Sequence, residues 1–339
     1  MAQDKSTLVK NMKHLLFGQD AAVDSIVPYV QMHQAGLAPE GRPVGVFLLL
    51  GPTGTGKTKT IEALANCIHG NEKNHLRIDC GEFQMEHDVA KLIGAPPGYL
   101  GHRETHPLIS QQKLNAVTSD HSNLSIILFD EVEKAASSLC RLLLGVLDKA
   151  SLRLGDNTSV NFERSLIFMT SNLGAREMFA TMEPKFGFSR PKIEFNEALP
   201  RLEAIGTAAV KKRFAPEFVN RLDAVITYRP LEPKAYELII DAELGAVQRH
   251  IFKRLGAKAF RLDIASSAKR YLQEKGTSQE FGARELKRMI HRQLIQPLAV
   301  MVNDELIQPQ QAVRVTGGSK GLRLRVVGAA AVEDVDLAA

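Results

Sequence analysis

One eight-residue segment combines glycines, a lysine and a threonine at the spacing GxxxxGKT: Gly51-Pro52-Thr53-Gly54-Thr55-Gly56-Lys57-Thr58. Glycine lets the backbone wrap around an anion, so that its N–H groups point inward. The lysine ammonium can reach the β- and γ-phosphates of a nucleotide, and the Thr58 hydroxyl can ligate Mg²⁺. The alternative is a glycine-rich turn that binds nothing. Because the lysine and threonine stand in register, the segment predicts binding of a nucleoside triphosphate.

Two adjacent carboxylates, Asp130 and Glu131, follow the apolar run Ser125-Ile126-Ile127-Leu128-Phe129. Phosphate hydrolysis needs a metal that neutralises phosphate charge and a separate group that positions or activates water. We therefore expect Asp130 to hold Mg²⁺, directly or through water, and Glu131 to polarise the attacking water. Acids often end a strand before a loop, which is the alternative. Their place after the glycine-rich segment favours the hydrolytic interpretation.

The elements that must position these residues form an alternating pattern. Up to about Arg229, apolar strand-like runs alternate with amphipathic stretches, which is typical of βαβ units and a parallel sheet. The glycine-rich segment lies between the first run and a helix that begins near Thr60. The fold class predicted is therefore α/β, with a P-loop parallel-sheet domain. The predicted strands are Val46–Leu50, Leu76–Ile78, Ser125–Phe129, Ser165–Met169 and Ala224–Thr227.

Pro230 and Pro233 break the alternation, and the pattern from Lys234 to about Leu306 is helical. Val313–Val315 and Leu322–Val326 flank a glycine-rich turn and predict a terminal hairpin. We expect a large nucleotide-binding domain over residues 1–229, a small helical lid domain over 230–328 and a flexible tail over 329–339. Apolar residues at helical spacing predict one buried face in the lid. They are Leu286, Met289, Ile290, Leu294, Leu298 and Met301.

Composition limits the class of protein. The chain has 339 residues, of which 44% are hydrophobic and 24% charged, as in an ordinary globular protein. No apolar run approaches the roughly 20 residues that span a bilayer, and the N-terminus lacks the apolar core of a signal peptide. The three cysteines form no CxxC pair, which predicts a reducing, cytoplasmic setting without a disulfide framework. The net charge of +5 includes no basic block that would indicate nucleic-acid binding.

Seven blocks of the chain, in order, resemble the second ATPase module of the Clp-type AAA+ unfoldases, the ClpA, ClpB and ClpC proteins. The resemblance extends from about Leu16 to Val327. The P-loop follows the second block as it does in that family. The blocks are Phe17–Val23, Arg42–Leu48, Leu92–Gly101, Asp130–Ala135, Met169–Gly174, Phe214–Asp223 and Gly282–Arg288.

The resemblance implies a role for residues that are ambiguous by themselves. Phe17 and Gly18 would lie beside the adenine of ATP. Asn172 would be a sensor of the γ-phosphate, although an Asn at a strand-to-loop turn is common. Arg221 would be an arginine finger that enters a neighbouring subunit's site, against the alternative of a surface ion pair with Glu217 or Asp223. Arg284 would be a second sensor that couples the lid to the nucleotide, against the alternative of a solvated charge on a helix.

The segment around Tyr99 resembles the pore loop with which this family grips its substrate. Prolines precede Tyr99 and glycines flank it, which is typical of an aromatic at a loop tip. A tyrosine packed beneath a loop is the alternative. In the family, such a tyrosine lines the pore of a hexameric ring, and Leu100 would add apolar contact. The resemblance thus implies a Mg²⁺-dependent ATPase, assembled as a homo-oligomer, that threads unfolded or misfolded polypeptide.

Several features depart from the family. The chain has one ATPase module, where ClpA, ClpB and ClpC proteins have two, so it is either an excised module or a stand-alone relative. The segment Ala135–Ser138 lacks the usual His-Pro. Phe186-Gly187-Phe188 is similar to the tripeptide that docks Clp proteins on the ClpP peptidase, but Phe186 replaces an aliphatic residue. Two phenylalanines packed in a turn are the alternative that we favour.

Two other functions remain open at this point. One is a nucleotide-dependent switch or scaffold that remodels a partner without threading it, although such a switch needs no pore tyrosine. The other is a nucleic-acid translocase or clamp loader. Tyr99, in place of a loop rich in lysine and arginine, disfavours the second function. Stimulation of ATP hydrolysis by unfolded protein or by DNA distinguishes them.

Overall fold

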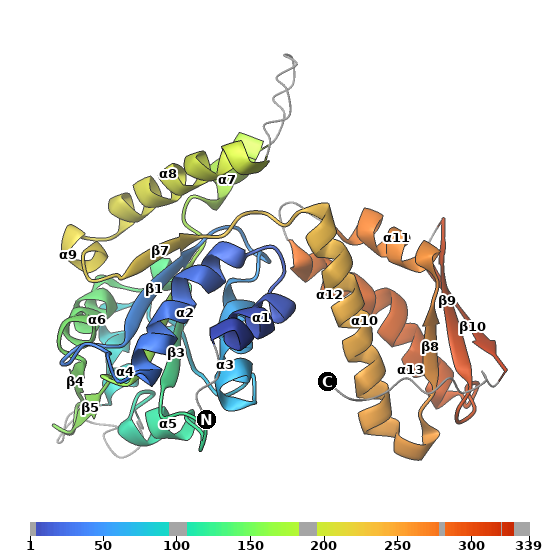
Figure 1. The fold of residues 1–339 in the computed structure, drawn as a ribbon, viewed down its shortest axis with the longest axis horizontal. Coiled ribbons are helices and arrows are strands. Elements are labelled where there is room, and N and C mark those ends of the chain that lie inside the picture. Colours follow the sequence, from blue (N-terminus) through green and yellow to red (C-terminus); the bar gives the residue numbers. More distant parts are fainter. Residues whose placement is uncertain (1–4, 95–106, 183–194, 278–281, 320, 329–339) are drawn as a thin grey trace, which may run out of the picture. The chain divides into compact units, whose positions relative to one another are not determined.

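A computed structural model describes residues 5–94, 107–182, 195–277, 282–319 and 321–328 of the chain (Figure 1). The chain divides into two compact units, Met1–Pro230 and Leu231–Ala339, and each is described by itself. Two of the sequence predictions fall outside the described residues: the loop with Tyr99 and Leu100, and the segment Phe186–Phe188. The proposed tail from residue 329 is also outside them.

A five-stranded parallel sheet forms the centre of the first unit (Figure 1). Its spatial order is β2-β3-β6-β1-β7, and every neighbouring pair is parallel. The five strands predicted from the sequence are confirmed, each with bounds within two residues of the prediction. They are β1 (Gly45–Leu50), β2 (Leu76–Asp79), β3 (Ser125–Asp130), β6 (Ser165–Ser171) and β7 (Ala224–Thr227).

Helices cover both faces of this sheet, because alternate side chains of each central strand point to opposite sides. Phe47 and Leu49 of β1 pack with helices on one face, and Leu48 and Leu50 pack on the other. The first group of helices is α1 (Lys5–Leu15), α2 (Asp20–Gln34) and α3 (Lys57–His69). The second group is α6 (Ser137–Lys149), α8 (Phe195–Arg213) and α9 (Pro216–Val219). All six residues of β1 and of β3 are buried as a result.

Shorter elements complete the first unit. A two-stranded hairpin, β4 with β5, was not predicted, because three-residue strands are too short to show a period. The remaining elements are η1 (Cys80–Glu82), η2 (Glu86–Asp88), α4 (Val89–Ile93), α5 (Gln111–Ala116), η3 (Val132–Lys134), β4 (Ser151–Arg153), β5 (Ser159–Asn161) and α7 (Ala175–Met182).

The second unit packs helices against a small sheet. The predicted terminal hairpin is confirmed as β9 (Ala312–Gly318) with β10 (Gly321–Val327). The prediction that the region before it is mostly helical is confirmed, and the one described strand that was not predicted there is β8 (Arg261–Ile264), which pairs in parallel with β9. The helical elements are α10 (Pro233–Leu255), η4 (Gly256–Lys258), α11 (Ser266–Gly276), α12 (Ala283–Ile290), η5 (His291–Ile295) and α13 (Gln296–Asn303).

The predicted apolar face of the second unit is largely buried. Leu286, Met289, Ile290, Leu294 and Leu298 are in the core, whereas Met301 is half-buried. The π-helical turn η5 lies between α12 and α13 along this face. It precedes Pro297, which has no N–H to donate to the previous turn. In the part of the chain that is described, no helix has both the length and the apolarity to cross a membrane.

Candidate active site

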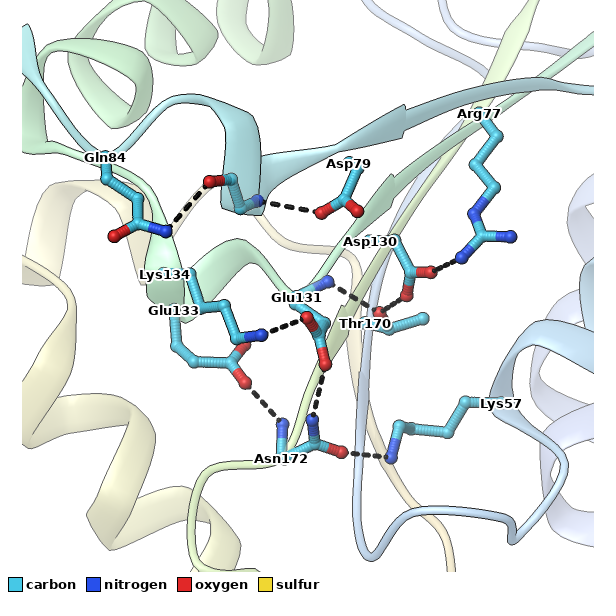
Figure 2. A network of polar contacts seen from close by, with 11 residues as sticks. Lys57, Arg77, Asp79, Gln84, Asp130, Glu131, Glu133, Lys134, Thr170 and Asn172 are labelled. Atoms are coloured by element: carbon cyan, nitrogen blue, oxygen red, sulfur yellow. Dashed lines mark hydrogen bonds and ion pairs between the residues drawn. The ribbon is translucent and has the colours of Figure 1, made fainter. Parts of the chain in front are cut away.

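Four of the predicted residues of the first unit, Lys57, Asp130, Glu131 and Asn172, meet at the carboxyl edge of its sheet (Figure 2). The glycine-rich segment follows β1, Asp130 ends β3, and Asn172 follows β6. These three strands are parallel neighbours, so their carboxyl ends lie together. Ligands of open parallel sheets bind at this edge. The sheet therefore brings the glycine-rich segment and two carboxylates to one place.

The glycine-rich segment has a positive φ at Gly51, Gly54 and Gly56, which residues other than glycine rarely adopt. Gly51 has a φ of 140°, and a Cβ atom there would lie 2.5 Å from the Tyr228 carbonyl oxygen. Gly56 has a φ of 105° and is the N-cap residue of α3. The first N–H groups of a helix have no partner within the helix and attract anions. The segment thus leads directly into a helix N-terminus suited to phosphate.

We expect Gly51→Ala to destabilise the protein by about 2–5 kcal/mol and to weaken ATP binding. The positive φ costs about 1–2 kcal/mol, and the contact with the Tyr228 carbonyl adds an overpacking cost of about 1–3 kcal/mol. Gly70→Ala is the matched control, since Gly70 has a φ of 72° but nothing within 4 Å of its Cβ position. Urea unfolding and titration with a fluorescent ATP analogue measure both effects. An equal loss in the two variants would contradict the close contact.

Lys57, the first residue of α3, folds back over the segment that precedes it. Its Nζ donates hydrogen bonds to the carbonyl oxygens of Gly51, at 2.5 Å, and Pro52, at 2.9 Å. A third bond goes to Asn172 Oδ1 at 3.0 Å. Each of these acceptors is neutral, and an ammonium binds a charged phosphate oxygen more strongly than a neutral one. The buried ammonium is therefore held where a phosphate chain in the loop can exchange for its present partners.

Asp130 is held by one partner on each carboxylate oxygen. Oδ1 accepts a hydrogen bond from the Thr170 hydroxyl, and Oδ2 pairs with Arg77 Nη2 at 2.5 Å. Thr170 lies on β6 and Arg77 on β2, the two strands on either side of β3. The carboxylate is nearly buried and its orientation is set from both sides.

The residues present fit a Mg²⁺ ion that arrives with a nucleotide. Mg²⁺ is usually bound by one or two protein oxygens together with phosphate oxygens and water, rather than by a cage of protein groups. Thr58 and Asp130 offer a hydroxyl and a carboxylate. Among the residues that the structure describes, no group of three or more His, Cys, Asp or Glu could hold a metal alone. A hydroxyl and a carboxylate are oxygen donors of the kind that Mg²⁺ takes from a protein when phosphates supply its other ligands.

Glu131 has a left-handed backbone and a side chain held from two directions. Its φ is 57°, which is unusual for a residue other than glycine and is found at functional sites. Its backbone N–H donates to Thr170 Oγ1 at 2.9 Å. Oε2 pairs with Lys134 Nζ at 2.5 Å, and Oε1 accepts from Asn172 Nδ2 at 3.4 Å. The hydrogen bond and charge of Glu131 raise the pKa of Lys134.

Asn172 connects Lys57 of the glycine-rich segment to the carboxylate of Glu131 (Figure 2). Its side-chain amide accepts from Lys57 and donates to Glu131. Its backbone N–H donates to Glu133 Oε1 at 3.0 Å, which fixes the turn after β6. The neutral amide of Asn172 thus lies between the Lys57 ammonium and the Glu131 carboxylate and is hydrogen-bonded to both. This geometry suits a residue that senses phosphate or orients water.

Phe17 and Gly18 lie between α1 and α2, in a segment fastened to the P-loop. The buried Gln19 side chain donates to the Thr55 carbonyl at 3.1 Å and to the Arg229 carbonyl at 2.8 Å. Arg229 in turn donates to the Gly18 carbonyl at 3.3 Å. These bonds set the segment beside the glycine-rich loop, where the resemblance expects the adenine.

The structure pairs Arg221 with a residue that the sequence did not suggest. Arg221, in the turn after α9, forms an ion pair with Asp148 of α6, with 3.2 Å between Nε and Oδ1. The alternatives Glu217 and Asp223 were wrong as partners. The Asp223 carboxylate instead accepts hydrogen bonds from Arg42 Nη2, at 2.7 Å from Oδ1, and from the backbone N–H of Val46. Arg284 is the second residue of α12 in the second unit and is exposed.

Sequence reasoning missed several residues that shape the site. Thr170 offered a signal, since it is a polar residue within a buried strand, and buried hydroxyls need partners. Arg77 and Lys134 offered none, because their partners depend on how β2 pairs with β3 and on how the chain turns after Glu131. Gln19 belongs to the first block of resemblance, but its role as a link to Thr55 depends on the tertiary structure.

Two family models match the chain. Residues 42–225 match the AAA domain (Cdc48 subfamily), and residues 231–315 match the C-terminal, D2-small domain of ClpB protein. Chaperone protein ClpB of Meiothermus ruber is 36% identical over 282 residues, which are 83% of this chain and 30% of that protein. Chaperone protein ClpB of Staphylococcus epidermidis is 34% identical over 311 residues, 91% of this chain and 33% of that protein. The chain thus spans about a third of the length of these relatives.

Solved structures of Hsp104 have a similar fold. The closed-state cryo-electron microscopy reconstruction of Hsp104 with ATPγS and FITC casein has a TM-score of 0.79 and 27% identity. That match covers 95% of this chain and 51% of the Hsp104 chain. The Saccharomyces cerevisiae Hsp104–casein complex in its extended conformation has a TM-score of 0.78 and 26% identity. That match covers 93% of this chain and 51% of the Hsp104 chain.

Proposed function

The chain belongs to the Clp-type AAA+ family, and we propose that it is an ATP-hydrolysing subunit of a ring that unfolds other proteins. The observation that carries the hydrolytic part is the connected set of contacts from Lys57 through Asn172 to Glu131. These contacts join an ammonium, a side-chain amide and a carboxylate in one hydrogen-bonded group, which supports the roles proposed for the three residues. The casein-bound Hsp104 structures support polypeptide as the substrate class.

We propose the following division of roles in hydrolysis. The backbone of Gly51–Thr58 and the Lys57 ammonium bind the phosphates, and Phe17 and Gly18 contact the adenine. Thr58 and Asp130 would hold Mg²⁺, which would neutralise charge on the phosphates. Glu131 takes the proton of the attacking water, and Asn172 orients that water against the γ-phosphate. Lys134 and Asn172 hold the Glu131 carboxylate in place between them.

We further propose that neighbouring subunits complete the site and convert hydrolysis into movement. Arg221 of one subunit contacts the phosphates bound by the next, as an arginine finger does. Arg284 links the nucleotide to the second unit, so that hydrolysis changes the angle between the units by a hinge motion. Tyr99, with Leu100, grips polypeptide in the pore of a hexamer. Docking of a ClpP-like peptidase at Phe186–Phe188 stays a prediction.

The test compares two classes of stimulant for ATP hydrolysis. We expect an unfolded protein such as casein to raise the rate of phosphate release several-fold, and single-stranded DNA to leave it unchanged. The measurement is the steady-state rate with saturating ATP and Mg²⁺, at several concentrations of each stimulant. Stimulation by DNA alone would overturn polypeptide as the substrate. Absence of hydrolysis under all conditions would overturn the ATPase itself.

A further inference from the structure

The ion pair between Arg221 and Asp148 involves one side of the guanidinium, its Nε, and this affects how Arg221 could act as an arginine finger. Arg221 Nε lies 3.2 Å from Asp148 Oδ1, yet this nitrogen is buried and its N–H is not aimed at a hydrogen-bond acceptor. The two side chains are 38% and 45% exposed. The ion pair with Asp148 is made on the Nε side of the guanidinium. The guanidinium therefore turns its Nε edge inward, and no hydrogen bond to a described residue engages its fork of Nη1 and Nη2.

The backbone beneath this side chain is fixed. The Arg221 N–H donates to the Phe218 carbonyl at 3.2 Å, and the Asp223 N–H donates to the Val46 carbonyl at 2.9 Å. Phe218 is buried and stacks on Phe214. The backbone of the turn is thus fixed to β1 and to the core. Only the side chain of Arg221 keeps conformational freedom. That freedom is considerable, because a long basic side chain can adopt many rotamers.

Asp148 lies at a position where a carboxylate destabilises the helix that contains it. It is the next-to-last residue of α6, whose carboxyl end carries the negative end of the helix dipole. A negative charge there is unfavourable, by the same interaction that favours cations at this end. The exposed ion pair with Arg221 offsets this cost without adding much stability. The position of the carboxylate is therefore better explained by what it does to Arg221 than by the stability of α6.

We infer that Asp148 is a positioning residue for Arg221. It attracts the Nε edge toward α6 by charge rather than by a hydrogen bond, so that the fork of Nη1 and Nη2 projects toward the phosphate oxygens of a nucleotide in the neighbouring subunit. A planar guanidinium binds such oxygens through two parallel N–H groups, and only if its plane is correctly set. Holding the side chain in advance lowers the entropy lost when the two subunits form the site. This inference rests on the proposed function, in which Arg221 acts between subunits.

The test mixes two subunits with complementary defects. The acceptor carries Arg221→Ala and has a complete nucleotide site without a finger, and the donor carries Glu131→Gln and has a finger without turnover. Asp148→Asn is then placed either in the donor or in the acceptor of an equimolar mixture. In the donor we expect kcat to fall about two- to fivefold, the loss of an exposed ion pair, with KM for ATP unchanged. In the acceptor, where Arg221 is already absent, we expect the rate of the parent mixture.

Two controls separate positioning from a structural effect. Asp148→Glu in the donor keeps the charge and should restore most of the rate. Asp263→Asn in the donor breaks a comparable exposed pair, with Arg314 at 3.5 Å, and should leave the rate unchanged. Urea unfolding of Asp148→Asn should show equal or slightly greater stability, because a charge opposed to the dipole of α6 is removed.

The outcomes distinguish the inference from its premise. A fall in rate that is confined to the donor supports the positioning role. An equal fall in donor and acceptor, or no fall in either, overturns the role of Asp148 while the recovered activity of the parent mixture upholds the intersubunit site. Absence of activity in the parent mixture overturns both, since Arg221 then supplies nothing to a neighbouring subunit.

Discussion

Replacing Glu131 by glutamine is expected to lower the rate of ATP hydrolysis about 10²–10⁴-fold, the usual contribution of a general base, while ATP still binds. Glutamine has nearly the same shape and keeps an oxygen that can accept from Asn172 Nδ2. It has no charge to pair with Lys134, and its amide cannot take a proton from water. Binding depends on the glycine-rich segment and Lys57, which the substitution leaves intact. The variant should therefore retain nucleotide without turning it over.

Phosphate release and equilibrium binding of a fluorescent ATP analogue measure the two effects separately. Glu86→Gln is the matched control, because Glu86 is also a carboxylate of the first unit in an exposed ion pair, with Arg141 at 3.0 Å. We expect this control to hydrolyse ATP at the unmodified rate. Hydrolysis by Glu131→Gln at a near-normal rate would show that another group activates the water.

Replacing Arg221 by alanine is expected to lower hydrolysis by roughly 10³–10⁵-fold, the range measured for arginine fingers. The substitution removes positive charge that the neighbouring subunit's site requires only during the reaction. ATP affinity should change little, so the loss should fall on kcat. The fold should survive, since the side chain forms one exposed ion pair, which is worth little to stability.

Mixing distinguishes an arginine finger from an arginine of the same subunit's site. Arg221→Ala and Glu131→Gln subunits should each be inactive, whereas an equimolar mixture should recover activity. If the subunits assort randomly in a ring with head-to-tail contacts, about a quarter of the sites combine an intact carboxylate with an intact finger. Recovery near that fraction is the expected result. A mixture that stays inactive would place Arg221 in its own subunit's chemistry or outside the chemistry altogether.

Much of the nucleotide site follows from the sequence for a physical reason. A buried parallel strand shows as a continuous apolar run, and parallel strands bring their carboxyl ends to one edge. Once Val46–Leu50, Ser125–Phe129 and Ser165–Met169 are recognised as strands, the residues that follow them must be neighbours. Lys57, Asp130, Glu131 and Asn172 could thus be grouped without coordinates, and the structure places hydrogen bonds among three of them.

The contacts that depend on register or on packing could not be predicted in this way. Arg77 reaches Asp130 because β2 pairs with β3 so that Asp79 lies beside Asp130. Asp148 rather than Asp223 meets Arg221, because the Asp223 carboxylate already binds Arg42 and the backbone of β1. Neither contact can be inferred from the sequence alone. Short elements were missed for a different reason, since β8, with four residues, shows too little alternation to stand out from the helical pattern around it.

The proposal that this protein pulls on polypeptide is tested most directly by ATP-driven unfolding of a stably folded fluorescent protein that carries an unstructured tail. The unmodified protein and Tyr99→Ala are compared, and phosphate release is recorded in the same samples. We expect the unmodified protein to abolish the fluorescence only while it hydrolyses ATP, and Tyr99→Ala to hydrolyse ATP without abolishing it, because an aromatic grip is lost. Unfolding at the same rate by both proteins, or hydrolysis by the unmodified protein without any unfolding, would contradict the proposal.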